Sequence, residues 1–214
     1  MRKMDIVYED KELLVVNKPS KLLTISDGKT NHTLYSMAYD YIKKQHKQNK
    51  IFIVHRLDRD TSGIVVFAKN ERVKFYLQDN WNNIVKREYI AVLEGKLSQK
   101  KGIIKDYLYE DKNHFVHVSK NKKGLLAQTE YEVLDYFDNN TTVKINILTG
   151  RKNQIRASFS NIGHSILGDK KYGSKNNYNR LYLHAYKLSF VFKNKEYVFE
   201  SKIPKELEKY LGNK

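Results

Sequence analysis

A polar loop between two apolar runs, within residues 54–69, is the feature that most constrains the fold of this chain. β-Branched and aromatic residues fill the runs at 51–54 and 64–68, and the connection between them carries His55 and Asp58. Runs of this kind predict a strand, a loop and a second strand. A short connection held by two buried strands is a place where a rigid scaffold presents reactive side chains.

The charged residues of this loop have two interpretations. In the first, they are solvated charges around a tight turn in which Gly63 supplies a free φ. In the second, Asp58 is a reactive carboxylate whose flanking residues, Arg56 and Arg59, favour its ionised form. Arginine is scarce, with eight among 40 basic residues, and four of the eight lie in this loop and in residues 151–156. We favour the second interpretation, because a planar guanidinium suits two-point binding of carboxylates and phosphates.

The string HRLD at residues 55–58, followed by TSG at 61–63, resembles the active-site motif of the RluA-type RNA pseudouridine synthases. The resemblance implies that Asp58 is the catalytic nucleophile and that Arg56 enters the space vacated by the flipped uridine. It also implies an RNA substrate. Isomerisation of uridine involves no redox change, so we expect no cofactor and no metal.

Three further stretches resemble motifs of the same family. Residues 8–19 are similar to its first motif, residues 86–95 to its second and residues 148–156 to its third. The resemblance implies that Tyr89 stacks on the target base and that Arg156 pairs with the catalytic carboxylate. These stretches are far apart in the chain, so the predicted site is assembled by the fold.

On this basis we assign substrate binding to Arg56, Tyr89, Ile155 and Arg156, and RNA binding to Arg59, Arg151 and Gln154. The chain departs from the family pattern at three positions: Lys21 stands where Gly is usual, and Asn153 and Ser158 stand where His is frequent. These departures leave Asp58 and Arg156 in place. They put in question the turn geometry near residue 21 and the contacts with RNA.

Hydrophobic periodicity predicts helices at 33–48, at 71–82, from the residue after Gly150 to Gly163, and at 204–211. It predicts strands at 5–9, 13–17, 51–54, 64–68, 86–95 and 197–200, with an antiparallel meander over 102–148. We therefore predict an α+β fold, a mostly antiparallel mixed sheet with flanking helices and a central active-site cleft. The family resemblance spans residues 5–204, including residues 168–173. We expect a single pseudouridine synthase catalytic domain over residues 1–214, without the S4-type domain that many relatives carry.

The net charge of +16 makes a polyanion, and nucleic acid first of all, the natural partner. The chain has no Cys, which excludes disulfides and thiolate metal or redox sites. It shows no apolar run of signal-peptide or membrane-span length, so we expect a cytoplasmic monomer that does not bind membranes. His114 and His117 show no carboxylate partners in the sequence pattern, and we interpret them as surface residues.

Other functions stay open on the sequence alone. A non-catalytic RNA-binding or ribosome-assembly module would explain the charge equally well. A nucleoside hydrolase or glycosylase would use Asp58 and Asp60 as a carboxylate pair. A metal-dependent nuclease using His55 is disfavoured, because the neighbouring arginines compete with a cation. Among RNA substrates we favour ribosomal RNA, with transfer RNA second, and either attack on C1′ or removal of a sugar proton fits Asp58.

Overall fold

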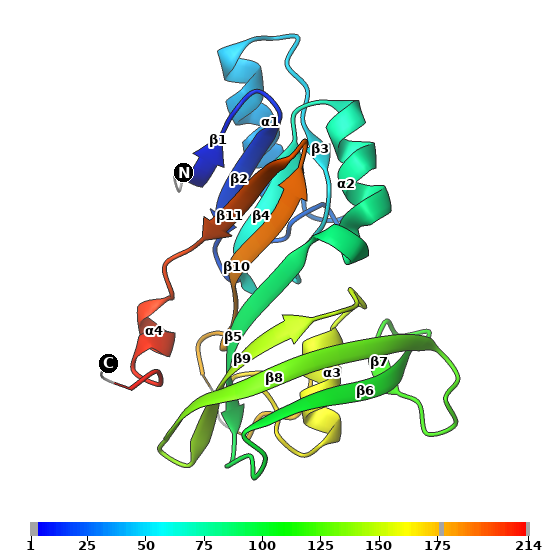
Figure 1. Cartoon of the computed structure of the whole chain (residues 1–214), viewed down its shortest axis with the longest axis vertical. Helices are drawn as coiled ribbons and strands as arrows, with labels where there is room; N and C mark the ends of the chain where they lie inside the picture. The colour runs from blue at the N-terminus through cyan, green and yellow to red at the C-terminus, as the bar shows by residue number, and fades with distance from the viewer. Residues whose placement is uncertain (1–3, 176–177, 213–214) are drawn as a thin grey trace. The chain divides into compact units, whose positions relative to one another are not determined.

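A computed structural model describes residues 4–175 and 178–212. The chain forms two compact units, drawn together in Figure 1. Unit 1 comprises Met1–Val85 and Ala185–Ser201, and unit 2 comprises Lys86–His184 and Lys202–Lys214. That both units act as the one catalytic domain expected from the sequence, with a central cleft, stays a prediction.

Unit 1 combines a sheet with two helices. Its elements are β1 (Asp5–Glu9), β2 (Leu13–Lys18), α1 (Leu34–Gln45), β3 (Phe52–Ile53), β4 (Ser62–Ala68), α2 (Glu71–Ile84), β10 (Leu183–Phe192) and β11 (Lys195–Glu200). β2 and β3 both pair antiparallel with β4, β1 pairs with β2, and β10 forms a hairpin with β11. The strand, loop and strand predicted around Asp58 are confirmed as β3, the connection and β4.

β4 is buried along its whole length because each face of its sheet carries a helix. Val66 shares a core cluster with Val73 and Leu77 of α2. Phe67 points to the opposite face by strand alternation, and its ring lies 6.3 Å from that of Tyr35 in α1. The two helices predicted in this part of the chain are confirmed. They hold rigid the strand that follows Asp58.

Unit 2 is built on an antiparallel sheet. Its elements are β5 (Lys86–Glu94), β6 (Lys101–Glu110), β7 (Val116–Val118), β8 (Leu125–Phe137), β9 (Asn140–Ile147), α3 (Gln154–Asn161) and α4 (Lys205–Glu208). The strands lie in the order β5-β9-β8-β6-β7, with antiparallel pairing throughout this set. The predicted meander and the α+β class are confirmed. Ala157 of α3 packs with Ala127 and Tyr172 in the core of this unit.

Strand β10 was missed as a strand by the sequence reasoning. Leu188, Phe190 and Phe192 alternate with more exposed residues, which is the period of a half-buried strand. Lys193 and Asn194 follow with φ of 51° and 59°, a turn conformation that links β10 to β11. The signal was present, but the Tyr, His, Lys and Ser residues of the stretch obscured it.

The two histidines of the β6–β7 region have acidic partners, so our expectation that they lack carboxylates was wrong. His114 Nδ1 lies 2.6 Å from Glu110 Oε1, and His117 Nε2 lies 2.9 Å from Asp111 Oδ2. The antiparallel turn between β6 and β7 brings each pair together. Within the described residues, no helix is long and apolar enough to span a bilayer.

Candidate active site

Asp58 lies in the connection between β3 and β4, residues 54–61, called here the Asp58 loop. Its side chain is half-buried, whereas those of Arg56 and Arg59 are exposed. Within residues 4–175 and 178–212, no hydrogen bond or ion pair involves the side chain of either arginine. Both guanidinium groups are therefore presented to solvent.

Three side chains, from the last residue of β2 and the segment that follows it, hold the backbone of the Asp58 loop. The Thr24 hydroxyl donates to the Leu57 carbonyl at 2.8 Å and accepts from the Leu57 amide at 3.2 Å. Ser20 Oγ donates to the Asp60 carbonyl at 2.7 Å. These bonds fix the peptides on either side of Asp58, which is the preorganisation that a reactive carboxylate requires.

Lys18 is the third of these anchoring side chains. It is fully buried, and its ammonium donates to the carbonyls of Pro19, Leu22 and Arg59 at 3.0, 2.7 and 3.0 Å. Three carbonyl acceptors satisfy the three donors of an ammonium, which is what makes its burial tolerable. The Lys18-Pro19 pair of the first motif is thus tied to the Asp58 loop.

Lys21 follows this pair with φ of 67°, in the left-handed region. Glycine adopts this conformation without a steric penalty, whereas a residue with Cβ is strained by about 1–2 kcal/mol. A turn that glycine would adopt without strain is therefore formed here by a lysine. Asn153 has φ of 51° at the start of α3, and Asn is among the residues that tolerate this region.

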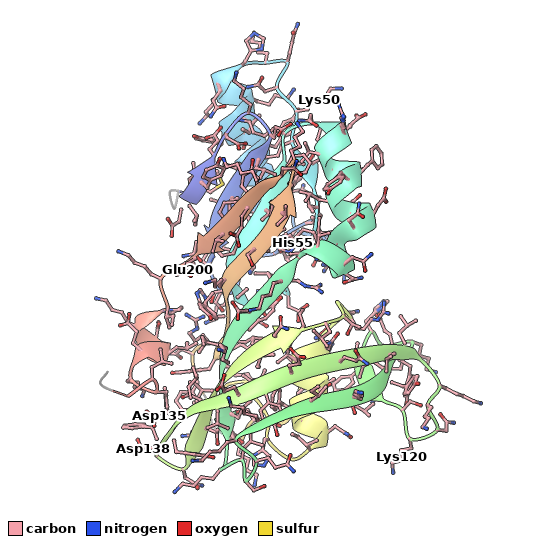
Figure 2. All side chains as sticks on the ribbon, viewed as in Figure 1. Lys50, His55, Lys120, Asp135, Asp138 and Glu200 are labelled. Carbon is pink, nitrogen blue, oxygen red and sulfur yellow. The ribbon has the colours of Figure 1, made fainter. Side chains whose placement is uncertain are left out.

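His55 has a structural role in the fold (Figure 2). Its Nε2 accepts a hydrogen bond from the Val66 amide at 3.0 Å, and its ring stacks on Trp81 at 4.5 Å between centroids. The lone pair that a metal would use at Nε2 is therefore engaged by the backbone. Among the residues described, His, Cys, Asp and Glu side chains do not gather in threes as a metal site would require. Trp81 packs against the core of unit 1.

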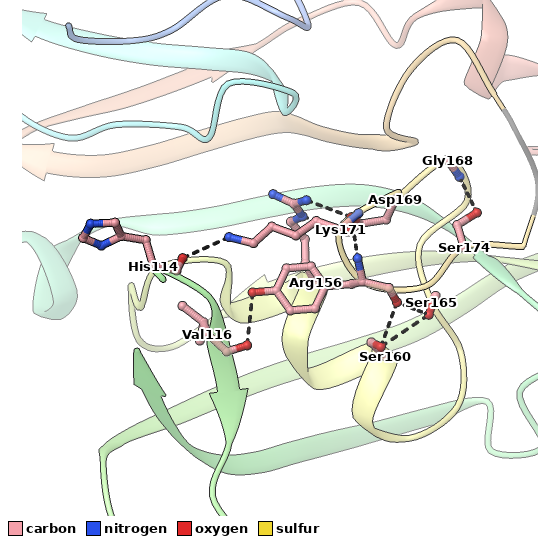
Figure 3. A network of polar contacts seen from close by, with 10 residues as sticks. His114, Val116, Arg156, Ser160, Ser165, Gly168, Asp169, Lys171 and Ser174 are labelled. Carbon is pink, nitrogen blue, oxygen red and sulfur yellow. Dashed lines mark hydrogen bonds and ion pairs between the residues drawn. The ribbon is translucent and has the colours of Figure 1, made fainter. Parts of the chain in front are cut away.

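Arg156 lies in α3 and is held by Asp169 (Figure 3). Nε donates to Oδ2 at 2.7 Å and Nη2 donates to Oδ1 at 2.8 Å. Both side chains are almost fully buried, and the Arg156 guanidinium also lies 5.1 Å from the centroid of the Tyr172 ring. The sequence reasoning noted residues 168–173 as a family pattern but assigned no role to Asp169.

The other residues assigned in the third motif differ in exposure. Gln154 is buried, and its amide bonds to Thr149, to the Arg151 amide, to the Gln128 carbonyl and to Thr129. Arg151 is half-buried and donates from Nε to the Leu126 carbonyl at 3.1 Å. The polar start of α3 is therefore tied to the sheet of unit 2, and this orients Arg156.

Tyr89 and Ile155 are both buried, at 8% and 5% exposure. Tyr89 lies in β5 opposite Ile145 of β9. Ile155 precedes Arg156 in α3, which is buried from Gln154 to Phe159. Their assignment to substrate binding stays a prediction that rests on the motifs.

Comparison with known proteins identifies the family. Residues 12–161 match the family described as RNA pseudouridylate synthase, and the chain belongs to this family of isomerases. It is 36% identical over 194 residues to "Uncharacterized RNA pseudouridine synthase YhcT" of Bacillus subtilis, covering 88% of this chain and 64% of that protein. It is 34% identical over 220 residues to "Ribosomal large subunit pseudouridine synthase D" of Borreliella burgdorferi, covering 97% of this chain and 68% of that protein.

The fold is also shared with a solved structure. "Human RNA Pseudouridylate Synthase Domain Containing 4" superposes with a TM-score of 0.80 at 22% identity, over 95% of this chain and 90% of that one. The predictions of the family and of its fold are therefore confirmed. The chain spans about two thirds of the length of the bacterial relatives described above.

Proposed function

We propose that this chain converts uridine to pseudouridine within structured RNA, with Asp58 as the catalytic carboxylate. The observation that carries the proposal is the Asp58 loop itself. Its motif residues lie between β3 and the fully buried β4, and the anchoring side chains Lys18, Ser20 and Thr24 bind its backbone. A carboxylate held this way meets substrate without first being ordered, which lowers the barrier to reaction.

The reaction breaks the bond from N1 to C1′, turns the uracil over and joins C5 to C1′. Both attack of the carboxylate on C1′ and removal of a sugar proton require Asp58 in its ionised form. We assign to Arg156 the orientation of this carboxylate. Asp169 engages Nε and Nη2 of Arg156, which fixes the guanidinium for this role. Tyr89 would stack on the uracil while it is detached.

The exposed arginines of the Asp58 loop suit contacts with RNA. We propose that Arg56 enters the stack vacated by the target uridine, since an enzyme must extrude a base to act on it. Arg59 and Arg151 would bind phosphates. Gln154 would have to give up its bonds within the chain to touch RNA, so we assign it the positioning of the start of α3.

We propose ribosomal RNA as the substrate class, with transfer RNA second. Supporting this choice, one relative carries the name ribosomal large subunit pseudouridine synthase D. The charge of +16 suits a large polyanion. Such a substrate implies action in the cytoplasm, and we propose that the chain acts there as a monomer without cofactor or metal.

The test is release of tritium from RNA labelled at uridine C5, because forming the new C5 bond expels that hydrogen. Ribosomal and transfer RNA are purified separately from cells that lack this gene, so the target uridines are unmodified. We expect the wild-type protein to release tritium from one pool, which names the substrate class. Asp58→Ala and Asp58→Asn should release none while still binding RNA.

Asp60→Asn is the matched control, because it removes a second carboxylate from the same loop. We expect it to keep turnover. Loss of turnover in this variant, together with free uracil among the wild-type products, would indicate a glycosylase that uses both carboxylates. Turnover by Asp58→Ala would refute the assignment of Asp58. Tight binding of RNA by the wild type without any tritium release would favour a non-catalytic RNA-binding module.

A further inference from the structure

A groove of about 760 Å³ lies on unit 2, outside all the motif residues assigned to catalysis. It lies along β6 and β7 and the loop between β7 and β8. Its lining includes Tyr109, His117, Lys120, Asn121, Lys123 and Asn161. Figure 2 labels Lys120 in that loop. Aromatic and basic side chains that share a groove are the combination that single-stranded nucleic acids require.

The aromatic part of the groove is an exposed ring supported by a second ring. Tyr109 is 45% exposed, and its ring stacks on His117 at 5.3 Å with an interplanar angle of 25°. His117 in turn packs against Phe115 at 4.6 Å and is held by Asp111 at 2.9 Å. The support limits the rotamers of Tyr109, so stacking of a base on this ring would cost little ordering.

The stacked rings continue from the groove to Arg156. Phe115 packs on Tyr172 at 4.7 Å, and the Arg156 guanidinium lies 5.1 Å from the Tyr172 ring. Lys171 Nζ lies 5.1 Å from the Phe115 ring and donates to the His114 carbonyl at 3.0 Å (Figure 3). The groove is therefore joined, within unit 2, to the arginine that we assign to the catalytic carboxylate.

The basic part of the groove is a short loop with three exposed lysines, Lys120, Lys122 and Lys123. Within the described part of the chain, their ammonium groups form no hydrogen bond or ion pair. The first acidic residues before and after the loop in the sequence, Asp111 and Glu130, are engaged by His117 and Asn146. The loop thus presents uncompensated positive charge, which complements phosphates.

The conformation of this loop is set by its own contacts. Ser119 Oγ donates to Asn121 Oδ1 at 2.7 Å and accepts from the Lys123 amide at 3.0 Å. Gly124 has φ of 124°, and a Cβ at this position would lie 2.4 Å from the Leu108 carbonyl oxygen. The lysines are therefore carried by a defined turn and are placed beside the aromatic platform before any ligand arrives.

We propose that this groove binds the single-stranded RNA segment that flanks the target uridine, with a base on Tyr109 and phosphates on Lys120 and Lys123. The inference rests on the proposed function, because it takes RNA as the substrate. It adds a second point of attachment beyond the uridine pocket. Since stacking and phosphate contacts do not read base identity, the groove would set affinity and leave the choice of uridine to the active site.

The test measures binding of a fluorescein-labelled oligouridylate of about 12 nucleotides by fluorescence anisotropy. We expect Tyr109→Ala to weaken binding about tenfold and Tyr109→Phe to stay within about twofold, because the stacking face is retained. Lys120→Gln with Lys123→Gln should lower the slope of log Kd against log salt by about 1.4. In the tritium assay, Tyr109→Ala should raise KM and leave kcat unchanged.

The matched control is a pair on α2, the exposed Phe75 and the half-buried Lys74, whose Nζ lies 4.7 Å from the Phe75 ring. Lys74→Gln with Phe75→Ala removes the same chemistry from another surface and should leave binding unchanged. Equal losses in the control, or no loss in Tyr109→Ala, would overturn the proposal. In a competition experiment, poly-glutamate should displace the labelled oligonucleotide far less effectively than unlabelled RNA. Equal displacement by the two polyanions would indicate that the groove binds acidic protein instead.

The two proposals fail separately. Tritium release that depends on Asp58, with RNA binding unaffected by Tyr109→Ala, would support the synthase activity and refute RNA binding in the groove. RNA binding that depends on Tyr109, without tritium release from any RNA pool, would support RNA binding in the groove and refute the synthase activity.

Discussion

Asp169 fixes the plane of the Arg156 guanidinium through two parallel hydrogen bonds, from Nε at 2.7 Å and from Nη2 at 2.8 Å. The carboxylate is itself fixed, because Oδ1 also accepts from the amides of Lys171 and Tyr172, each at 3.1 Å. Arg156 therefore has a single orientation set by its own unit. A guanidinium oriented in advance acts on a carboxylate partner without being ordered at the moment of reaction.

Asp169→Asn should lower kcat at least about tenfold and leave RNA binding nearly unchanged, because Asp169 is a positioning residue for Arg156. It should also lower the free energy of unfolding by roughly 3 kcal/mol, since a buried guanidinium loses its counter-charge. Steady-state tritium release and urea unfolding measure the two effects. A normal kcat in a destabilised variant would show that the pair is structural only.

Arg156→Lys should lose most activity, because one ammonium cannot engage Asp169 and a second carboxylate in the geometry of a planar fork. The measurement is single-turnover tritium release with saturating enzyme, which separates the chemical step from binding. Near-normal turnover would count against the pairing of Arg156 with Asp58.

Thr24→Val should slow turnover and destabilise the protein by about 2 kcal/mol. The substitution keeps the shape of the side chain but removes the hydroxyl. The amide and the carbonyl of Leu57 then both lose their hydrogen-bond partner. Thr24→Ser is the control and should behave like the wild type. If Thr24→Val retains full kcat at a temperature where it is folded, the anchoring of the Asp58 loop is unnecessary for catalysis.

Lys21→Gly should raise the free energy of unfolding by roughly 0.5–1 kcal/mol. Removing Cβ relieves the strain of φ 67°, and the greater freedom of Gly in the unfolded chain offsets part of the gain. Lys21→Ala keeps the Cβ and should show no gain, which makes it the matched control in the same urea titration. Equal stability of the Gly and Ala variants would mean that the turn is not strained.

His184 should make the protein less stable in acid. Burial, with a smaller contribution from Arg180, lowers the pKa of His184 to about 3, and a hydrogen bond with the backbone of Lys202 acts in the opposite direction. Between pH 6.5 and 3 the unfolded chain binds a proton at this residue and the folded chain does not. The stability is therefore complete above pH 6.5 and falls as the pH decreases through that window.

The expected loss at His184 between pH 7.5 and 5.0 is about 2 kcal/mol, because each unit of pKa difference corresponds to about 1.4 kcal/mol. Urea unfolding at the two pH values measures it. In His184→Gln this part of the pH dependence should disappear, whereas the exposed His32→Gln should leave it unchanged. If the free energy of unfolding of His184→Gln depends on pH as that of the wild type does, another group is responsible for the acid sensitivity.

Local patterns of the chain were sufficient for most elements and for the Asp58 loop. The apolar runs on either side of residues 55–61 predicted β3 and β4, because β-branched and aromatic residues favour strands. The motif strings then singled out Asp58 and Arg156. β10 shows the limit of this approach, since its alternation of Leu188 and Phe190 was diluted by polar residues at its start.

Contacts between distant residues were decided by the tertiary structure. Thr24 and Leu57 are 33 residues apart, and Lys18 and Arg59 are 41 apart, yet each pair bonds directly. No local period encodes such a pair, because it depends on how strands and loops return past one another in the folded chain. The sequence by itself therefore determined which carboxylate and which arginine to expect, while the fold alone decided what holds them, since buried polar groups must find their partners wherever the chain brings them.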